Sequence, residues 1–531
     1  MDPERQRLAD EAWRHWGPFV AARAWGTVRE DYSADGEAWT SFPHEQARSR
    51  AYRWNEDGLA AVCDRAQTLC LGLALWNGVD PILKERPFGL TGLEGNHGED
   101  VKDCYWHLDA TPTHSWLRWR YHYPQAAFPY DDLMAENARR GQDQPEYELL
   151  DTGVFDEDRY WVVDLTYAKA APDDICVVIA VTNPGPEPAT LHVLPQLWFR
   201  NTWAWGQEVR AGPPSITERA RGALVARHQT LGEYTLSYDP AVGAAQPLFC
   251  DNETNSALLY GAPGRSAYPK DGINDRVVQG RPTVNPAGSG TKAAVWHQLS
   301  VDPGATAEVR LRLTAGPGPG DLGPAFTQVL ADRRAEADAF WSNVSGWAEL
   351  DEEGQAITRQ SLSGLLWSQQ FYHYNVRTWL QGDPAGPPPP LARLWGRNDR
   401  WQHLDANDVI VMPDTWEYPW FAAWDLAFHA VALAHVDPGL AKAQLLLLER
   451  EWYQHPNGQV PAYEWAFDDV NPPVQAWAAL RVFSLDGRQD VDFLSRMFHK
   501  LLLNFTWWAN REDALGDNVF TGGFLGLDNI G

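Results

Sequence analysis

Between residues 25 and 315 the chain consists of short apolar and aromatic runs separated by turn residues. Runs such as RYWVVDLTYAKA and ATAEVRLRLTAG are rich in Val, Tyr, Trp and Thr, and Pro, Gly, Asn and Asp lie between such runs. In the second run Val309, Leu311 and Leu313 alternate with arginines, which is the period of a strand with one buried face. Short strands with frequent turns predict antiparallel sheets stacked as a sandwich.

The hydrophobic period lengthens after residue 315. GPGPGDLGP at 316–324 is rich in helix and strand breakers and indicates a hinge. Apolar residues then recur every three or four positions, which predicts helices. The first is expected over 326–344, and residues 381–415 are expected to form a long polar loop. Further helices are expected in GQAITRQSLSGLLWSQQFYHYNVRTWL, YPWFAAWDLAFHAVALAHV, PGLAKAQLLLLEREWYQH, PPVQAWAALRVFSL and VDFLSRMFHKLLLNFTWWANR.

These two patterns predict a multidomain β and α protein. We expect a helical lead-in at 1–24, a β-sandwich domain at 25–315, a hinge and linker helix at 316–350, and part of a helical toroid at 351–531. The loops between the last helices hold many Trp, Tyr, Asp and Glu residues, so a site is expected where they converge. A ring of six helical hairpins, at about 40–60 residues each, needs roughly twice as much helical chain. We therefore expect only about the first half of the toroid, from a C-terminally truncated chain.

The charge balance and the cysteines restrict the partners. Lys and Arg number 44 against 71 Asp and Glu, a net charge of −27, which argues against nucleic acid or an anionic membrane as a partner. No secretory signal and no membrane-spanning apolar stretch is visible. The five cysteines lack a CxxC or Cys/His ligand pattern, so we expect reduced thiols, no metal site and a cytoplasmic location. The sequence predicts no oligomeric state.

Tryptophan is unusually frequent: 28 residues, against 18 Tyr and 19 Phe. Indole rings stack on the C–H faces of sugars while the N–H group donates a hydrogen bond, so this composition suggests carbohydrate handling. For any single Trp the alternative is packing in the core. The chain holds no GxSxG or HExxH motif and no convincing dinucleotide fingerprint, so no cofactor is expected.

The segment EYPWFAAWDLAFH places one carboxyl group in an apolar run. Pro419 suits the first turn of a helix, and His429 lies four residues after Asp425, on the same helical face. Asp425 is either an acid kept protonated by an apolar pocket lined by Trp420 and Trp424, or half of a buried Asp–His brace. The pattern alone does not separate the two interpretations.

Two further segments carry candidate sugar contacts. HPNGQVPAYEWAFDDVNPP, between two predicted helices, offers Tyr463, Glu464, Trp465 and Asn471. Glu464 has the alternative roles of helix cap or ion-pair partner. QQFYHYN, which contains Tyr374, suits a pocket wall and an inter-domain seam equally well.

Taken together, the chain resembles glycoside hydrolase family 63, in particular its bacterial glucosidase-like members, which are related to mannosyl-oligosaccharide glucosidase. The resemblance runs over essentially the whole chain. It implies a β-sandwich, a linker and an (α/α)6 toroid, and hydrolysis of an α-glucosidic bond with inversion. The matching stretches are WGTVREDYS, EQARSRAYRWNEDGLA, ELLDTGVFDEDRY, QFYHYNVRTWLQGDP, MPDTWEYPWFAAWDLAFH, HPNGQVPAYEWAFDDVNPPVQAWA and GGFLGLDNIG.

The resemblance also implies roles for single residues. The acid of such enzymes falls on Asp425, and Asp528 in the last stretch is a further candidate for substrate binding. The partner base is a Glu from the later part of the toroid, and no segment of this sequence matches it. We therefore expect an inverting α-glycosidase of small glucosides or oligosaccharides whose base lies beyond residue 531, so that this chain alone is inactive. The alternative is a non-catalytic carbohydrate-binding or scaffold protein; phosphorolysis would require a basic phosphate pocket that the sequence does not indicate.

Overall fold

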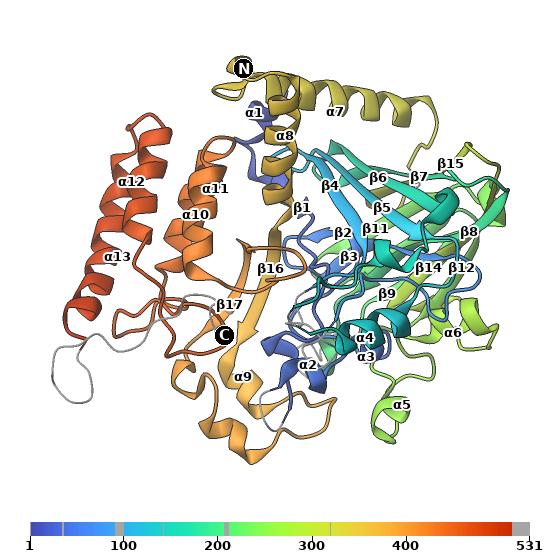
Figure 1. The fold of residues 1–531 in the computed structure, drawn as a ribbon, viewed down its shortest axis with the longest axis horizontal. Helices are drawn as coiled ribbons and strands as arrows, with labels where there is room; N and C mark the ends of the chain where they lie inside the picture. Colours follow the sequence, from blue (N-terminus) through green and yellow to red (C-terminus); the bar gives the residue numbers. More distant parts are fainter. Residues whose placement is uncertain are drawn as a thin grey trace.

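The structure is a computed structural model that describes residues 2–33, 37–90, 100–141, 143–205, 212–318 and 320–511. The strands of the two large sheets gather on one side of the molecule, and the longer C-terminal helices stand on the other (Figure 1). The protein is therefore a mixed β and α protein, as the sequence predicts.

All strands of the two large sheets pair in antiparallel fashion. The six-stranded sheet has the order β1 (Trp16–Gly17), β2 (Leu59–Asp64), β3 (Leu69–Trp76), β8 (Ala189–Phe199), β14 (Lys292–Val301) and β12 (Gln246–Cys250). The nine-stranded sheet has the order β13 (Ser289–Gly290), β9 (Ser215–Ala220), β10 (Ala223–His228), β11 (Gly232–Tyr238), β15 (Thr306–Ala315), β7 (Asp174–Thr182), β6 (Tyr160–Ala171), β5 (Trp116–Pro124) and β4 (Cys104–Ala110).

The two sheets share one hydrophobic core. Leu71 and Val193 of the smaller sheet and Leu165 and Val177 of the larger sheet belong to the same buried cluster. Burial of these apolar side chains is the main force that holds the sheets together. The alternation predicted for β15 is confirmed: its Val and Leu side chains are buried, whereas the intervening arginines stay partly exposed.

Thirteen α-helices occur in the described residues. The short ones are α1 (Pro3–Arg7), α2 (Ala38–Ser41), α3 (His44–Ala47), α4 (Tyr130–Arg139), α5 (Ser256–Tyr260), α6 (Gly272–Gln279) and α9 (Val376–Gln381). The others are α7 (Pro324–Ser342), α8 (Glu352–Trp367), α10 (Ala423–Leu433), α11 (Pro438–Leu448), α12 (Gln475–Leu485) and α13 (Val491–Ala509).

Helices α7 and α8 connect the sheets to the C-terminal helices. Helix α7 packs on β5, β6 and β7, and α8 contacts β4 on one side and α10 on the other. Helix α10 also packs on α11 and α12, and α12 packs on α13 (Figure 1). Helix α8 therefore lies between the sheets and the C-terminal helices and contacts both.

The predicted helix through QQFYHYN is wrong in its second half. Helix α8 ends at Trp367, and residues Gln369–Asn375 form β16, which pairs antiparallel with β17 (Asp405–Val411). Phe371, Tyr372 and Tyr374 are aromatic residues that favour strands. The strand pairs with β17 on one side, and the backbone N–H of Phe371 donates a hydrogen bond of 3.0 Å to the carbonyl oxygen of Phe19. The expected polar loop at 381–415 therefore includes a strand.

The first segment contains less helix than the sequence predicts, and the cysteines are free thiols. A helical lead-in is expected at 1–24, and the described part of this segment, residues 2–24, contains the short helix α1, a 3-10 turn and the strand β1. The five cysteines are free thiols, and Cys63 of β2 lies opposite Cys70 of β3. In the part of the chain that the structure describes, no helix is long and apolar enough to cross a membrane.

Candidate active site

The first turn of α10 is docked on the loop before α12. Ala422 forms a β-bridge with Tyr463, and the backbone N–H of Ala423 donates a hydrogen bond of 2.8 Å to the carbonyl oxygen of Ala462. These bonds hold Asp425, in the first turn of the helix, beside the loop that carries Tyr463, Glu464 and Trp465. The structure thus brings together the two segments that the sequence analysis singled out.

The predicted place of Pro419 in the first turn of this helix is wrong. Ala422 has an extended backbone, with φ −143° and ψ 113°, and α10 begins only at Ala423. Because Ala422 is bonded to Tyr463 as in a strand, the helix does not start earlier. The carbonyl oxygen of Pro419 instead accepts a hydrogen bond of 2.5 Å from Nη2 of Arg29.

Asp425 is half-buried, and its pKa is raised. Burial is the main cause, because it disfavours the charged carboxylate; a hydrogen bond with the Trp424 side chain opposes the shift. Trp424 is itself half-buried, with its ring 6.4 Å from that of Phe428. The protonated form of the carboxyl group is therefore favoured by burial, although Trp424 lies beside it.

His429 is not bonded to Asp425 among the residues that the structure describes. Its Nδ1 atom is buried without a hydrogen-bond partner there, and burial lowers its pKa to about 4. The imidazole is therefore neutral near pH 7. The interpretation as a buried Asp–His brace has no hydrogen bond to support it.

Glu464 forms a fully buried ion pair. Its carboxylate lies 3.1 Å from Nε of Arg29, and both side chains are 0% exposed. Burial raises the pKa of Glu464, and the attraction of Arg29 opposes this shift. The ion pair, one of the alternatives that the sequence left open for Glu464, is thus present.

Trp420, in the segment before α10, contacts Trp465 of the Glu464 loop. Trp420 is buried, and its ring meets that of the half-buried Trp465 edge to face, with 5.5 Å between centroids and an angle of 85°. The guanidinium carbon of Arg397 lies 5.1 Å from the centroid of the Trp465 ring. The indole N–H of Trp465 is buried and has no hydrogen-bond partner within the described ranges.

The remaining predicted residues have different surroundings. The hydroxyl group of the half-buried Tyr463 donates a hydrogen bond of 2.6 Å to Asp469, and Asn471 is buried in the same loop. Tyr374 is 0% exposed and packs edge to face on Trp54, 5.7 Å away. It therefore occupies a seam between the N-terminal half and the helices. Asp528 lies outside the described residues.

Two residues outside the predicted site residues hold this loop. Arg29 pairs with Glu464 and also bonds the carbonyl oxygen of Pro419, so it ties both segments to the N-terminal part of the chain. The Nδ2 atom of Asn398 donates a hydrogen bond of 2.6 Å to the backbone oxygen of Glu464. The only sequence signal was that Arg29 belongs to the stretch WGTVREDYS and Asn398 to a polar loop.

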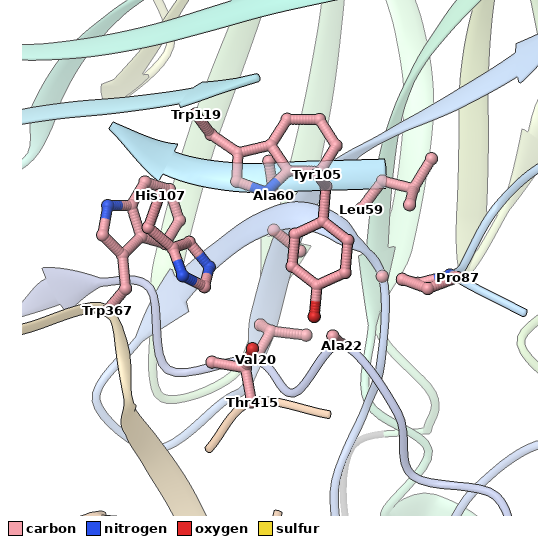
Figure 2. Close-up of a pocket in the computed structure, with 12 residues that line it drawn as sticks. Val20, Ala22, Leu59, Ala60, Pro87, Tyr105, His107, Trp119, Trp367 and Thr415 are labelled. Carbon is pink, nitrogen blue, oxygen red and sulfur yellow. The ribbon is translucent and has the colours of Figure 1, made fainter. Parts of the chain in front are cut away.

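A small cavity marks the seam beside the sheets. It has a volume of about 20 Å³, enough for about one water molecule and too small for a sugar. Figure 2 shows its walls: β2, β4 and β5 contribute side chains, Trp367 enters from the end of α8, and the Tyr105 hydroxyl points toward the segments of Ala22 and Thr415. The rings of His107 and Trp367 stack 4.9 Å apart.

One part of the chain matches a known protein family, and the whole chain has a similar relative. Residues 418–522 match the family model of the mannosylglycerate hydrolase MGH1-like glycoside hydrolase domain. The whole chain is 43% identical, over 572 aligned positions, to an uncharacterised protein of Saccharomyces cerevisiae. The alignment covers 99% of this chain and 52% of the yeast protein, so the chain spans about half the length of that relative.

Solved structures show only remote similarity. A putative aldose 1-epimerase from Escherichia coli K12 is 10% identical over 40% of this chain and 67% of its own, with a TM-score of 0.20. A putative kojibiose phosphorylase from the human microbiome is 6% identical over 68% of this chain and 44% of its own, with a TM-score of 0.26. A family GH92 glycosyl hydrolase is 13% identical over 96% of this chain and 65% of its own, with a TM-score of 0.25.

The family match covers α10 to α13 and the loop of Glu464, and it therefore includes the stretches around Asp425 and Glu464 whose motifs pointed to a glycosidase. Residues 418–522 are therefore similar to a glycoside hydrolase domain of the mannosylglycerate hydrolase-like, family 63 type, which agrees with the resemblance found in that part of the sequence.

Proposed function

We propose that this protein is an inverting glycosidase in which Asp425 is the general acid. The observation that carries the proposal is the half-buried carboxyl group of Asp425, with a raised pKa, in the first turn of a helix inside the glycoside hydrolase segment. A general acid must hold its proton near neutral pH to give it to the leaving oxygen. The half-buried rings of Trp424 and Trp465 suit stacking on a sugar.

Inversion needs a second carboxylate about 6.5–9.5 Å away, with a water molecule between the two carboxyl groups. Glu464 is unsuited to that role, because it is 0% exposed and paired with Arg29. We propose that the catalytic base lies beyond residue 531, so we expect the 531-residue chain alone to lack appreciable activity. The proposed substrate is an α-glucosidic bond of a small glucoside or oligosaccharide, and the proposed location is the cytoplasm.

We also propose the domain division at 25–315, 316–350 and 351–531, with the last part belonging to an (α/α)6 toroid. Apolar side chains on the outer faces of α12 and α13 support the toroid. Trp477 and Leu480 are 45% and 60% exposed, and Phe498 and Phe505 are 65% and 67% exposed. Such faces suit helices that pack against further helices of a ring.

The test is Asp425→Asn in the full-length protein. Asn keeps the shape of the side chain but has no acidic proton, so turnover of an unactivated α-glucoside should fall by about 10²–10⁴. NMR of the first product should show the β-anomer of the sugar in the wild type, as inversion requires. A parallel panel of α-mannosides identifies the sugar.

The matched control is Asp468→Asn in the same part of the fold. Asp468 lies on the exposed surface of the Glu464 loop, where it pairs with Arg400, and its removal should leave turnover unchanged. Wild-type turnover by folded Asp425→Asn would refute the role of Asp425. Sugar binding without any turnover by the wild type would favour the non-catalytic alternative.

A further inference from the structure

A cavity of about 670 Å³ lies at the sheet side of the protein, where α3 and α4 meet (Figure 1). Its volume is in the range of pockets that bind small molecules, about 300–1,000 Å³. None of the candidate residues at α10 or its neighbouring loop lines it. We call this cavity the α4 pocket, and its walls come from residues 25, 43–48, 81–88 and 127–134.

The inner wall of the α4 pocket is aromatic. Phe88 and Phe128 are buried, and their rings lie 5.0 and 4.5 Å from that of Tyr130. His44 continues the wall, 5.1 Å from Phe88 and 5.4 Å from Trp25. Aromatic walls of this kind offer apolar contact area to the C–H groups of a ligand ring.

Cations behind this wall disfavour a cationic ligand. The Nζ atom of Lys84 lies 3.5 Å from the centroid of the Phe128 ring and 4.9 Å from that of Tyr130. Burial holds the pKa of His44 well below its usual range, and the charges of Lys84, Arg86 and Arg48 lower it further. The rings of Phe128 and Tyr130 therefore already contact the Lys84 ammonium group, and this charge would repel a second cation in the pocket.

The mouth of the α4 pocket is acidic. Glu45 of α3 and Asp131 and Asp132 of α4 line it and are exposed, against one lining cation, the half-buried Arg48. Carboxylates at the mouth repel an anion, while their oxygens accept hydrogen bonds from hydroxyl groups. An apolar wall, a positive interior and an acidic mouth together favour a neutral ligand that carries several hydroxyl groups.

Two buried polar atoms of the wall lack a partner. The indole N–H of Trp25 and the hydroxyl group of Tyr130 are buried without a hydrogen bond among the described residues. Trp25 is 0% exposed, so its N–H group is out of reach of a ligand, whereas Tyr130 is half-buried and lines the pocket. Buried polar groups are nearly always hydrogen-bonded, so a ligand with hydroxyl groups would supply the partner that the Tyr130 hydroxyl group lacks.

We propose that the α4 pocket is a second carbohydrate site that binds a neutral sugar ring of an oligosaccharide. It is distinct from the proposed site of hydrolysis, although its wall reaches toward that site. The ring of Trp25 meets that of Trp416, in the segment before α10, at 5.7 Å and 71°. Sugar in the α4 pocket would thus hold an oligosaccharide on the protein without taking part in bond cleavage.

The test is binding of maltotriose, measured by calorimetry on the full chain and on a variant with a blocked pocket. Ala127 lines the mouth and is exposed, so Ala127→Trp should fill the pocket and leave the fold intact. Its neighbour Ala126 is exposed and does not line the pocket, which makes Ala126→Trp the matched control. All variants carry Asp425→Asn, so that no maltotriose is consumed.

We expect a dissociation constant of about 1 mM or below, loss of one binding event in Ala127→Trp, and no change in Ala126→Trp. Tyr130→Phe should weaken the same event by about three- to tenfold, the value of one hydrogen bond. Glucosamine and glucuronate should bind more weakly than maltotriose. Equal binding by both Trp variants, preferred binding of a charged sugar, or no maltotriose binding would overturn the proposal, whatever the outcome for hydrolysis.

Discussion

At the scale of single residues, the buried contacts of Arg29 and Glu464 explain how the candidate site is held. A charge that is fully removed from water is stabilised only by a close partner and by hydrogen bonds. Arg29 has Glu464 at 3.1 Å, the carbonyl oxygen of Pro419, and the ring of Tyr372 5.1 Å from its guanidinium carbon. The Arg29–Glu464 pair therefore fixes the position of the loop that lies beside Asp425.

Removing one partner of this pair should be costly. Arg29→Met leaves the Glu464 carboxylate buried without its cation, and we expect a loss of about 3–5 kcal/mol in the free energy of unfolding. The double variant Arg29→Met/Glu464→Met should recover much of that loss, because no charge then remains buried. Chemical denaturation of the single and double variants measures both values.

The exposed pair Arg400–Asp468 provides the control. Its side chains are 62% and 66% exposed, and breaking it with Arg400→Met should cost about 1 kcal/mol or less. Equal losses for the buried and the exposed pair would contradict a structural role for Arg29.

At the scale of elements, β16 shows where prediction from sequence ends. The run QFYHYN follows a helical pattern without a breaker, and its mixed apolar and polar residues fit either period. Its partner β17 lies beyond a long polar loop, so the pairing that makes it a strand is not local. By contrast, β15 alternates so regularly that its strand was predictable.

The same distinction applies to the candidate site. Asp425, Trp424 and the preceding Trp420 lie in one short stretch of chain, so this part of the site is local and visible in the sequence. The ion pair of Glu464 joins residues that are 435 positions apart, and no pattern near Glu464 indicates Arg29. Likewise, only the folded structure shows that Tyr374 is covered by Trp54.

The burial of β16 predicts how Tyr374 responds to substitution. Tyr374→Phe removes only a hydroxyl group that accepts a 3.4 Å hydrogen bond from Asn398, so activity of the full-length protein should remain and stability should fall by about 1 kcal/mol. Tyr374→Ala should cost about 3–5 kcal/mol, because it leaves a cavity. Activity assays and denaturation curves separate the two effects; a large loss of activity in a stable Tyr374→Phe would instead favour a substrate contact.

At the scale of the whole molecule, Glu449 should make stability depend on pH. It follows α11, is 0% exposed, and both its carboxylate oxygens lack a hydrogen-bond partner in the described part of the chain. Burial raises its pKa to about 7. Between its ordinary value near 4.5 and about pH 7 the folded state holds a proton that the unfolded state has lost. Stability from this group therefore falls as pH rises through that window.

Glu449→Gln should remove that dependence. At pH 8 the variant should exceed the wild type by up to about 3 kcal/mol in the free energy of unfolding, and the difference should shrink toward pH 4.5. Denaturation curves at several pH values test this. Glu451→Gln is the control, because Glu451 is 77% exposed and pairs with Lys500 at the surface; a difference that grows toward low pH would contradict the assignment.

Helix α13 exposes large apolar side chains on its outer face. Phe498, Leu502 and Phe505 are 65%, 49% and 67% exposed, and their spacing of four and three residues places them on one side of the helix. Contiguous apolar area of this kind promotes association. The purified chain should therefore associate as its concentration rises, and Phe498→Lys/Leu502→Glu should reduce that association in sedimentation velocity. Leu150→Lys, at an isolated leucine that is 69% exposed, should have no such effect, and a wild-type chain that stays monomeric at all concentrations would show that this face needs no cover.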